Sequence, residues 1–327
     1  MDWSNKTVLI TGGTGSFGRK FAEIVLKHKK PKKLIIFSRD ELKQHEMRQD
    51  FPDGENSPVR YFIGDVRDKE RLYRAFNDVD VVVHAAALKQ VPACEYNPFE
   101  AVQTNIIGAK NVLDAAIDKG VDKAIALSTD KAVNPINLYG ATKLCAEKMF
   151  IQSNTYAGGS GPKFAVCRYG NVVGSRGSVI PLFQKQRMTG KVSITDKRMT
   201  RFWITLDQGV DFVLKCIEGM YGGEIFVPKI PSMGVEDLAT AIAPKAEKQY
   251  VGIRPGEKLH EVLIAQEESQ NVLELENMYI IQPTHSWWKI ENWPGAKPVP
   301  NEFRYGSENN PVWMSTPEIE NLAKDIS

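Results

Sequence analysis

Residues 7–18 read Thr-Val-Leu-Ile-Thr-Gly-Gly-Thr-Gly-Ser-Phe-Gly, an apolar run that leads directly into a glycine-rich turn. The run is typical of a buried strand over Thr7–Thr11, and a helical pattern follows from residue 16. Glycines at these spacings permit a tight turn, close approach of a pyrophosphate to the backbone, and close packing of the helix. The pyrophosphate would bind the N–H groups at the helix start, where the helix dipole favours anions. We therefore expect a dinucleotide site rather than a purely structural turn, built from Gly12, Thr14, Gly15, Ser16, Phe17 and Gly18.

Short apolar runs alternate with longer amphipathic stretches through the rest of the first half. The expected strands are Thr7–Thr11, Leu34–Phe37, Arg60–Ile63, Val79–His84, Ala124–Ser128 and Phe164–Arg168. The expected helices lie near residues 16–28, 40–49, 68–76, 99–118 and 137–155. Apolar runs this continuous suit strands that are buried on both faces. Together with the alternation, they predict an α/β fold with a doubly wound parallel (Rossmann) sheet.

The second half of the chain has a looser pattern. Glycine and proline become frequent after about residue 171, and short elements replace the regular units. We expect an NADP- or NAD-binding domain over residues 1–170, with later strands near 205–228 interleaved into its sheet. Residues 171–327 would then form mainly a smaller C-terminal substrate-binding lobe.

The composition argues against several classes of protein. Of the 327 residues, 42% are hydrophobic and 25% are charged, as in ordinary globular proteins. The formal net charge of +2 predicts neither nucleic acid nor a membrane surface as partner. No apolar run is long enough to cross a membrane, and residues 1–6 do not predict a signal peptide. Because the cysteines lack metal-site spacing, we expect reduced thiols, a cytoplasmic location and no metal for Cys94, Cys145, Cys167 and Cys216.

The second expected strand ends in Phe-Ser-Arg-Asp, which bears on the choice of cofactor. An acidic residue at this strand tip would hydrogen-bond the ribose of NAD, whereas Ser38 and Arg39 suit the 2′-phosphate of NADP. Lys43 lies one helical turn further on and would assist them. Asp40 is the complication, but it is also placed to cap the next helix. We therefore expect NADP rather than NAD.

Further cofactor contacts are expected where the third and fourth strands end. Asp65 and Val66 follow the third strand, where the adenine should lie. Ala85 and Ala86 follow the fourth, and their small side chains would let the cofactor lie close to the backbone. His84 precedes them, but a histidine inside an apolar strand is more often a core residue than a catalytic one.

Residues 128–143 carry the candidate chemistry. Tyr139 and Lys143 lie one helical turn apart on the same face of an expected helix. An ammonium beside a phenol favours the phenolate, a base that can deprotonate an alcohol as hydride leaves the same carbon. Asp130 and Lys131 add a second acid and base, which simple alcohol oxidation does not need. The plainer alternatives are an ordinary helix pair, a helix-capping aspartate and a solvated lysine.

Together with the glycine turn, these residues resemble the extended short-chain dehydrogenases/reductases that act on nucleotide sugars. Several long stretches are similar, more narrowly, to the inverting UDP-N-acetylglucosamine 4,6-dehydratases, which open the pseudaminic acid pathway. The stretches are His-Ala-Ala-Ala-Leu-Lys-Gln-Val-Pro (84–92), Arg-Tyr-Gly-Asn-Val-Val-Gly-Ser-Arg-Gly-Ser (168–178), Arg-Met-Thr-Arg-Phe-Trp-Ile (198–204), Gly-Glu-Ile-Phe-Val-Pro-Lys-Ile-Pro-Ser (223–232) and Gly-Ile-Arg-Pro-Gly-Glu-Lys-Leu-His-Glu (252–261).

The resemblance implies a mechanism that these residues are able to carry. Tyr139, assisted by Lys143, would take the proton of the sugar's C4 hydroxyl as hydride passes to NADP, with Thr129 holding the C4 oxygen. Lys131 would remove the C5 proton, and Asp130 would protonate the departing C6 hydroxyl. Retaining relatives carry glutamate where this chain has Lys131, so the lysine implies inversion at C5. A lysine acts as a base only if its pKa is lowered by burial or by a neighbouring cation such as Lys143.

The resemblance also implies UDP-N-acetylglucosamine as the small-molecule substrate and a homo-oligomeric assembly. Arginine forks suit the pyrophosphate of UDP, and a carboxylate suits its ribose hydroxyls. Arg201 suits a salt bridge or an interface equally well, and Lys89 suits a solvated loop. The implied substrate contacts are Lys89, Asn171, Arg176, Arg201, Arg254 and Glu257.

Three other functions remain open at this point. A UDP-sugar 4-epimerase shares the glycine turn and the Tyr/Lys pair, but it needs no acid and base at C5 and C6. A retaining dehydratase remains if Lys131 does not act as the base. A non-catalytic dinucleotide-binding regulator would have no need of Tyr139 or Lys131, and both are present.

Overall fold

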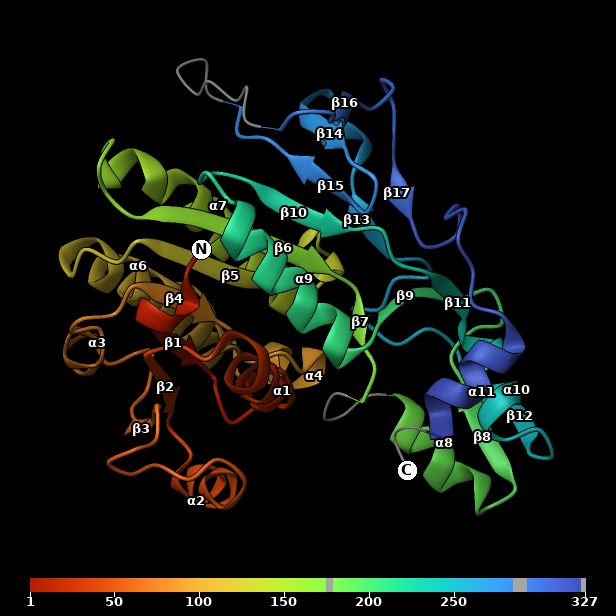
Figure 1. Ribbon diagram of the computed structural model, residues 1–327. Helices are drawn as coiled ribbons and strands as arrows, with labels where there is room; N and C mark the ends of the chain where they lie inside the picture. The colour runs from red at the N-terminus through yellow and green to blue at the C-terminus, as the bar shows by residue number, and fades with distance from the viewer. Residues whose placement is uncertain (175–178, 285–292, 325–327) are drawn as a thin grey trace.

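The computed structural model describes residues 1–174, 179–284 and 293–324, and its centre is a ten-stranded sheet (Figure 1). The strand order is β16-β14-β15-β10-β6-β5-β4-β1-β2-β3. The strands from β3 to β10 in this order are parallel, and β15, β14 and β16 extend the sheet antiparallel. The strands are β1 Thr7–Thr11, β2 Lys33–Ser38, β3 Val59–Ile63, β4 Val81–His84, β5 Lys123–Thr129, β6 Lys163–Tyr169, β10 Ile225–Pro228, β14 Val272–Glu274, β15 Met278–Ile281 and β16 Lys297–Pro298.

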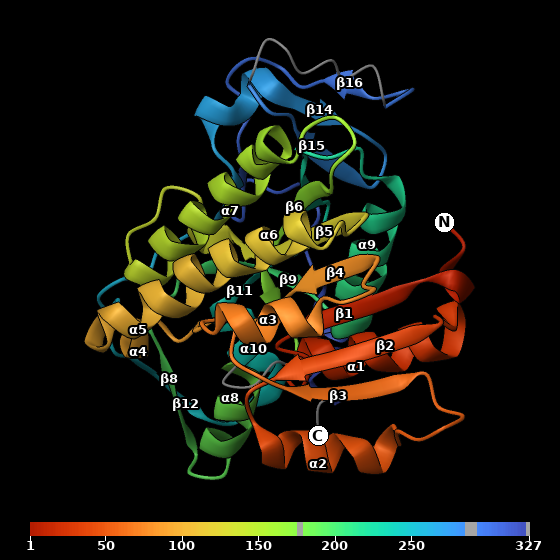
Figure 2. The ribbon, with the colours of Figure 1, turned by 90° about the vertical axis from the view of Figure 1, so that its left-hand side faces the viewer.

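Helices cover both faces of this sheet, so the expected doubly wound α/β fold is confirmed. Helices α1 and α9 pack side by side on one face, and α3, α6 and α7 form the layer on the other (Figure 2). The helices are α1 Ser16–Ile24, α2 Glu41–Asp50, α3 Lys69–Ala75, α4 Val91–Tyr96, α5 Pro98–Val102, α6 Gly108–Asp118, α7 Leu138–Ala157, α8 Val179–Arg187, α9 Leu206–Gly219, α10 Val235–Ile242 and α11 Thr316–Lys324.

The apolar runs of the first half form strands because both of their faces are covered. Every residue of β1 and β4 is buried, as parallel strands between two helical layers require. The six strands expected from the first half are all present, with bounds within two residues of those expected. The helix expected near 99–118 is interrupted, because a π-helical turn over Gln103–Ile107 separates α5 from α6.

A second, smaller hydrophobic core lies beside the carboxyl ends of the parallel strands, under α8, α10 and α11 (Figure 1). Its largest buried side chain is Trp203 of β9, and Phe183, Leu238 and Ile319 pack in the same cluster. Short strands frame this part: β7 Asn171–Val172, β9 Thr200–Ile204 and β11 Ser232–Gly234 in one sheet, β8 Lys191–Ile194 with β12 Glu247–Tyr250, and β13 Val262–Ile264 with β17 Tyr305–Gly306.

The C-terminal third also returns to the main sheet, which the sequence pattern did not predict. Strands β14, β15 and β16 pair antiparallel beyond β10, so residues 272–281 and 297–298 extend the large sheet. Among the described helices, none combines the length and the apolar composition that crossing a lipid bilayer requires.

Candidate active site

The turn after β1 has the geometry of a dinucleotide cradle. Gly12 has a φ of +66°, and a Cβ there would lie 2.9 Å from the backbone of Ala86. A Cβ on Gly18 would lie 2.3 Å from the carbonyl oxygen of Gly13, so only glycine lets α1 pack this closely on the turn. Gly15 precedes the first residue of α1, and no side chain caps this helix start. Its Cβ would meet only the Gly12 oxygen, at 3.2 Å, which leaves the helix N-terminus open to a pyrophosphate.

Other expected cofactor residues line the same edge of the sheet. The hydroxyl groups of Thr14 and Ser38 are hydrogen-bonded at 2.7 Å, which joins the glycine turn to the end of β2. The N–H of Ala86 donates to Oγ1 of Thr11 at 3.2 Å, so the alanines that follow β4 lie against the end of β1. Val66 is buried. Ser16 and Phe17 form the first turn of α1, and Ala85 directly follows β4.

Asp40 is the N-cap of α2. Its Oδ1 accepts the N–H of Lys43 at 3.0 Å, and its Oδ2 lies 2.7 Å from the Lys43 ammonium. Arg39 is half exposed, and its guanidinium lies 3.5 Å from the carboxylate of Asp65. Because the Asp40 carboxylate caps α2, it does not have to be a ribose ligand. The cations Arg39 and Lys43 lie beside the position where a ribose 2′-group would bind.

The end of β5 and the 3₁₀ turn Asp130–Ala132 carry the candidate acid and base. Asp130 is fully buried, and its Oδ1 accepts hydrogen bonds from the Thr129 hydroxyl (2.9 Å) and the Lys131 ammonium (3.0 Å). Its Oδ2 is buried and has no hydrogen-bond partner. The Lys131 ammonium also donates to Oδ1 of Asn171 at 3.4 Å, which brings the first residue of β7 into the same cluster.

Glu261 joins this cluster, and sequence reasoning assigned it no role. Its Oε1 lies 3.3 Å from the ammonium of Lys131, and the glutamate is 2% exposed. Burial alone would lower the pKa of Lys131, but the carboxylates of Asp130 and Glu261 outweigh it and hold this pKa above its ordinary value. The lowered pKa that the sequence reasoning required of Lys131 is therefore absent from this structure.

The first turn of α7 places Tyr139 against these groups. A Cβ on Gly140 would lie 2.0 Å from the carbonyl oxygen of Lys131, so glycine allows the helix to contact the 3₁₀ turn directly. The helix start is capped by Asn137, whose Oδ1 accepts the N–H of Gly140 at 2.8 Å. Burial raises the pKa of Tyr139 to about 12, against the opposing effects of the Lys131 ammonium and a hydrogen bond from Thr129. The lowered phenol pKa expected from the sequence is thus not present here.

Lys143 is buried one turn further along α7. Burial lowers its pKa to about 8, although the carboxylate of Glu147 opposes this shift. His84 of β4 lies close to it, and burial together with the Lys143 charge lowers the pKa of His84 to about 3. The neutral imidazole is hydrogen-bonded to Thr11 at 2.8 Å and stacks on the Phe150 ring. His84 is therefore a core residue, as its place in an apolar strand suggested.

The expected substrate residues are only partly brought together. Partial burial and the neighbouring Lys131 charge lower the pKa of Lys89, so this lysine lies near the cluster. The terminal nitrogens of Arg201 donate to the backbone carbonyls of Thr200, Leu259 and Lys258 at 2.7 to 3.1 Å, so this buried side chain is held within the protein.

Two further expected contacts lie in the exposed loop after β12. Arg254 and Glu257 pair with each other at 2.6 Å. Asn137 donates to the carbonyl of Gly256 at 2.8 Å, which ties this loop to the start of α7. Arg176 lies outside the described residues.

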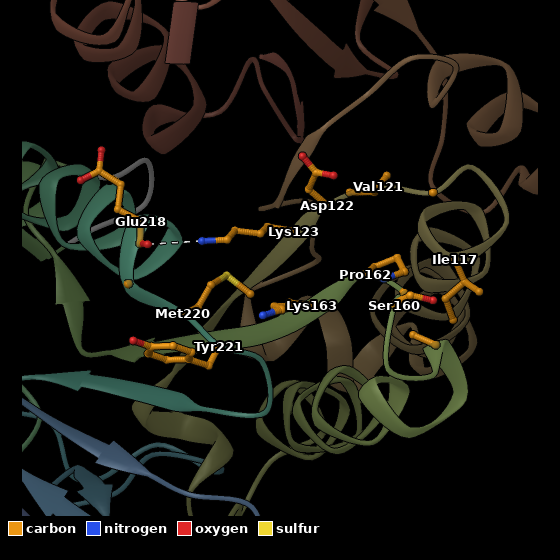
Figure 3. A pocket seen from close by; sticks show the side chains of 14 residues that line it. Ile117, Val121, Asp122, Lys123, Ser160, Pro162, Lys163, Glu218, Met220 and Tyr221 are labelled. Atoms are coloured by element: carbon orange, nitrogen blue, oxygen red, sulfur yellow. Dashed lines mark hydrogen bonds between the residues drawn. The ribbon is translucent and has the colours of Figure 1, made fainter. Parts of the chain in front are cut away.

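A cavity of about 740 Å³ lies elsewhere, at the amino ends of β5 and β6 (Figure 3). It contains none of the expected site residues. Lys123 lines it, and its ammonium donates to the carbonyls of Ile217 (2.7 Å) and Glu218 (3.3 Å), which satisfies the last turn of α9. Ligands of open parallel sheets bind at the carboxyl ends of the strands, which is the edge where Asp130 and Lys131 lie.

Comparisons with known proteins show the family of this chain. The profile of a family described as "Polysaccharide biosynthesis protein" matches residues 8–283. A Campylobacter jejuni protein named "UDP-N-acetylglucosamine 4,6-dehydratase (inverting)" is 54% identical, over 97% of each chain. A Rickettsia conorii protein named "UDP-glucose 4-epimerase" is 46% identical, over 85% of this chain and 83% of its own.

Among solved structures, that of Pen from Bacillus thuringiensis is 38% identical and superposes with a TM-score of 0.90, covering 100% of this chain and 99% of its own. The match to Pen covers both the parallel sheet and the smaller core, and so does the match to the Campylobacter jejuni protein. The chain belongs to the family described as polysaccharide biosynthesis protein, and within it to the group of inverting UDP-N-acetylglucosamine 4,6-dehydratases.

Proposed function

We propose that this protein is a UDP-N-acetylglucosamine 4,6-dehydratase that inverts C5. Its product would be UDP-2-acetamido-2,6-dideoxy-β-L-arabino-hex-4-ulose. The observation that carries this proposal is the ion pair of the buried Asp130 with the partly buried Lys131, which lies close to Tyr139 at the carboxyl end of β5. Similarity to the Campylobacter jejuni enzyme supports the choice of substrate.

NADP is the proposed cofactor, held by the glycine turn, Ser38, Arg39 and Lys43. When bound, it supplies the acceptor for the hydride that leaves C4 and the donor of the hydride that reaches C6. The open start of α1 suits the pyrophosphate.

Arg39→Ala should weaken binding of NADP by about 10- to 100-fold, the size of a lost charge-assisted hydrogen bond, and leave that of NAD nearly unchanged. Calorimetric titration with both dinucleotides measures this; an equal loss for both would refute the 2′-phosphate contact.

At C4, the proposed base is the phenolate of Tyr139. The hydroxyl of Thr129, which donates to Asp130 in this structure, would hold the C4 oxygen in line. The buried ammonium of Lys143 stabilises negative charge on the phenol. This attraction is stronger in the protein interior than in water, because the dielectric constant is lower there. Because the pKa of Lys143 is lowered to about 8, this lysine is charged at neutral pH.

At C5 and C6, the proposed acid and base are Asp130 and Lys131. Their contact of 3.0 Å allows a proton to move from the ammonium to the carboxylate, which yields a neutral amine and a carboxylic acid. The amine then takes the C5 proton, after which the acid protonates the C6 oxygen, and the C6–O bond breaks to release water. Both residues end in the charge states from which they started.

The UDP moiety is proposed to lie along the loop after β12. Arg254 and Glu257 would separate to meet the pyrophosphate and a ribose hydroxyl, and the exposure of Arg254 allows this. Asn171 and Lys89 would face the sugar, since both lie near Lys131. Arg176 is proposed as a further pyrophosphate contact on family position, and Arg201 is proposed to act by shaping this wall of the site.

Further proposals follow from the same assignment. We place the reaction at the start of the pseudaminic acid pathway, on the similarity to inverting dehydratases. A homo-oligomer is proposed because the side chains of Tyr96 in α4 and Phe99 in α5 are 86% and 83% exposed. Residues 1–170 are proposed to bind mainly the dinucleotide, and residues 171–327 mainly the UDP-sugar.

A 4-epimerase is the second candidate, because the Rickettsia relatives carry that name. Epimerisation changes only C4, so it needs no acid or base at C5 and C6, the role proposed for Asp130 and Lys131. Mass spectrometry of UDP-N-acetylglucosamine incubated with the protein and no reductant separates the two. Dehydration gives a product lighter by one water, and epimerisation gives an isomer of equal mass. An isomer alone would refute the dehydratase assignment, and an unchanged substrate would favour a non-catalytic protein.

A further inference from the structure

Glu261 is a buried carboxylate at which cations from different segments converge. Its side chain lies 3.3 Å from the ammonium of Lys131, 3.9 Å from the guanidinium of Arg201 and 4.0 Å from the ammonium of Lys258. Its Oε2 is buried and has no hydrogen-bond partner. Since buried polar atoms are nearly always paired, an unpaired carboxylate oxygen beside reacting groups points to a functional role.

The backbone around Glu261 is fixed independently of its side chain. Its N–H donates to the Ser307 hydroxyl at 2.9 Å, and its carbonyl accepts the N–H of Ser307 at 2.8 Å. The Ser307 hydroxyl is in turn bonded to the Thr200 hydroxyl at 2.7 Å. Arg201 is anchored on the neighbouring carbonyls of Lys258 and Leu259. The backbone of Glu261 is therefore held by β9 and the segment after β17, and its carboxylate reaches across to the end of β5.

We infer that Glu261 is a positioning residue for the C5 step: it aims the Lys131 side chain and stabilises its ammonium as the C5 proton arrives. This inference rests on the proposed function. Lys131 has a flexible four-carbon side chain. If Asp130 were its one partner, the position of the amine would be set by that contact alone. Contacts from Asp130, Asn171 and Glu261 fix it from three directions.

The charge balance explains why a second carboxylate is needed. When Asp130 holds the shared proton, it is neutral and no longer compensates a charge on Lys131. Transfer of the C5 proton to the amine then creates a buried ammonium, which needs a counter-ion before Asp130 has released its own proton. The Glu261 carboxylate takes no part in the proton transfer between Lys131 and Asp130, and it supplies that charge. Glu261 neither gives nor takes a proton in this step, so its role is to position and stabilise Lys131.

Several other groups face Lys131 and act on its charge. Arg201, Lys258 and Lys89 disfavour the ammonium, and Asp130 favours it. Tyr139 packs on it from α7. Among the groups described here, removal of the Glu261 charge would leave only the Asp130 carboxylate to favour the ammonium of Lys131 against these cations. At a separation of 3.3 Å the lost attraction is large enough to move the titration of Lys131 downward by about one pH unit or more.

The test compares Glu261→Gln and Glu261→Asp with the unaltered protein. Acetic anhydride labelling as a function of pH, read by mass spectrometry of the peptide that contains Lys131, reports when this lysine loses its proton. We expect Glu261→Gln to label at a pH lower by about one unit or more. Dehydration should fall about 10- to 100-fold, while oxidation at C4, followed as absorbance of the reduced nicotinamide, continues. Glu261→Asp restores the charge and should move the labelling curve back toward that of the unaltered protein.

Glu308→Gln is the matched control, because this glutamate pairs with Arg304 and also has a buried oxygen without a partner. It should change neither labelling nor product formation. Unchanged labelling of Lys131 in Glu261→Gln, or a parallel loss of both half-reactions with a lower melting temperature, would overturn the inference. Failure of the proposed function itself would look different, since the unaltered protein would then form no dehydrated product.

Discussion

Lys131 and Asp130 are consecutive residues, yet their side chains fold back on one another to form an ion pair of 3.0 Å at the end of β5. Asp130 is fully buried in this pair. Such a contact lets one proton be shared between a carboxylate and an amine, the two groups that water elimination requires. The pair is the feature that separates a dehydratase from an enzyme that only oxidises C4.

Lys131→Ala should abolish dehydration and leave the dinucleotide bound. Removal of the base at C5 is expected to lower product formation by about 10²–10⁴-fold, the usual contribution of a general base. Oxidation at C4 depends on Tyr139 and should persist. Mass spectrometry of the product and titration with NADP measure the two effects. Lys110→Ala, which removes an exposed ion pair with Asp114, is the control. Normal turnover of Lys131→Ala would refute its role as base.

Gly15→Ala should weaken dinucleotide binding with little effect on stability. A methyl group there meets only the Gly12 oxygen at 3.2 Å, so the protein tolerates it, but it would stand at the helix start that receives the pyrophosphate. Gly18→Ala, by contrast, should lower both affinity and melting temperature, because its Cβ would lie 2.3 Å from the Gly13 oxygen. Calorimetry and thermal melting give the two quantities. Equal losses of stability in both variants would contradict this assignment.

Arg168→Met should destabilise the fold by about 3–5 kcal/mol, the cost of removing one partner of a buried ion pair. Arg168 is 1% exposed, and it binds Glu147 of α7 at 2.7 and 3.0 Å and Glu268 at 2.9 and 3.0 Å. Its loss leaves the buried Glu147 charge without compensation. The free energy of unfolding in urea measures this effect.

Arg198→Met is the control for that experiment. It forms an ion pair with Asp196 at the protein surface, where solvent screening leaves such pairs little effect on stability. A comparable loss in both variants would mean that the buried network does not stabilise α7.

His84 should make stability depend on pH below 6.5. Its pKa is about 3 in the fold, against 6.5 for the free imidazole, so the unfolded chain binds the proton more readily. The stabilisation is complete above pH 6.5 and is lost as pH falls toward about 3, with a slope of about 1.4 kcal/mol per pH unit. His84→Gln should flatten the pH dependence of unfolding free energy in this window. An unchanged slope would show that another group controls it.

Much of the fold is predictable from the sequence because the first half obeys local rules. The bounds of β1 coincide with those of the apolar run, and α1 begins where the glycine turn ends. The strands β14 and β16 escaped prediction, because their residues are mostly half-buried or exposed and show no periodicity. Their place in the sheet is decided by pairing, because β14 pairs with β15 and β16 pairs with β14.

That several candidate residues lie together was predictable from the sequence, but their electrostatics were not. Thr129, Asp130, Lys131 and Tyr139 are close in sequence, so a motif reveals them. Glu261 comes from a distant segment, and its carboxylate acts with that of Asp130 to reverse the direction of the pKa shift expected for Lys131. Such a contact depends on how β9 and the segment after β17 pack, which no local pattern in the sequence encodes.

The central claim is dehydration with inversion at C5, and one measurement tests it most directly. The protein is incubated with UDP-N-acetylglucosamine in D₂O without a reductant, and the products are followed by NMR. The account predicts a 4-keto-6-deoxy sugar that carries deuterium at C5 and has the L-arabino configuration. A product with the D-xylo configuration would contradict inversion, and UDP-N-acetylgalactosamine would contradict dehydration.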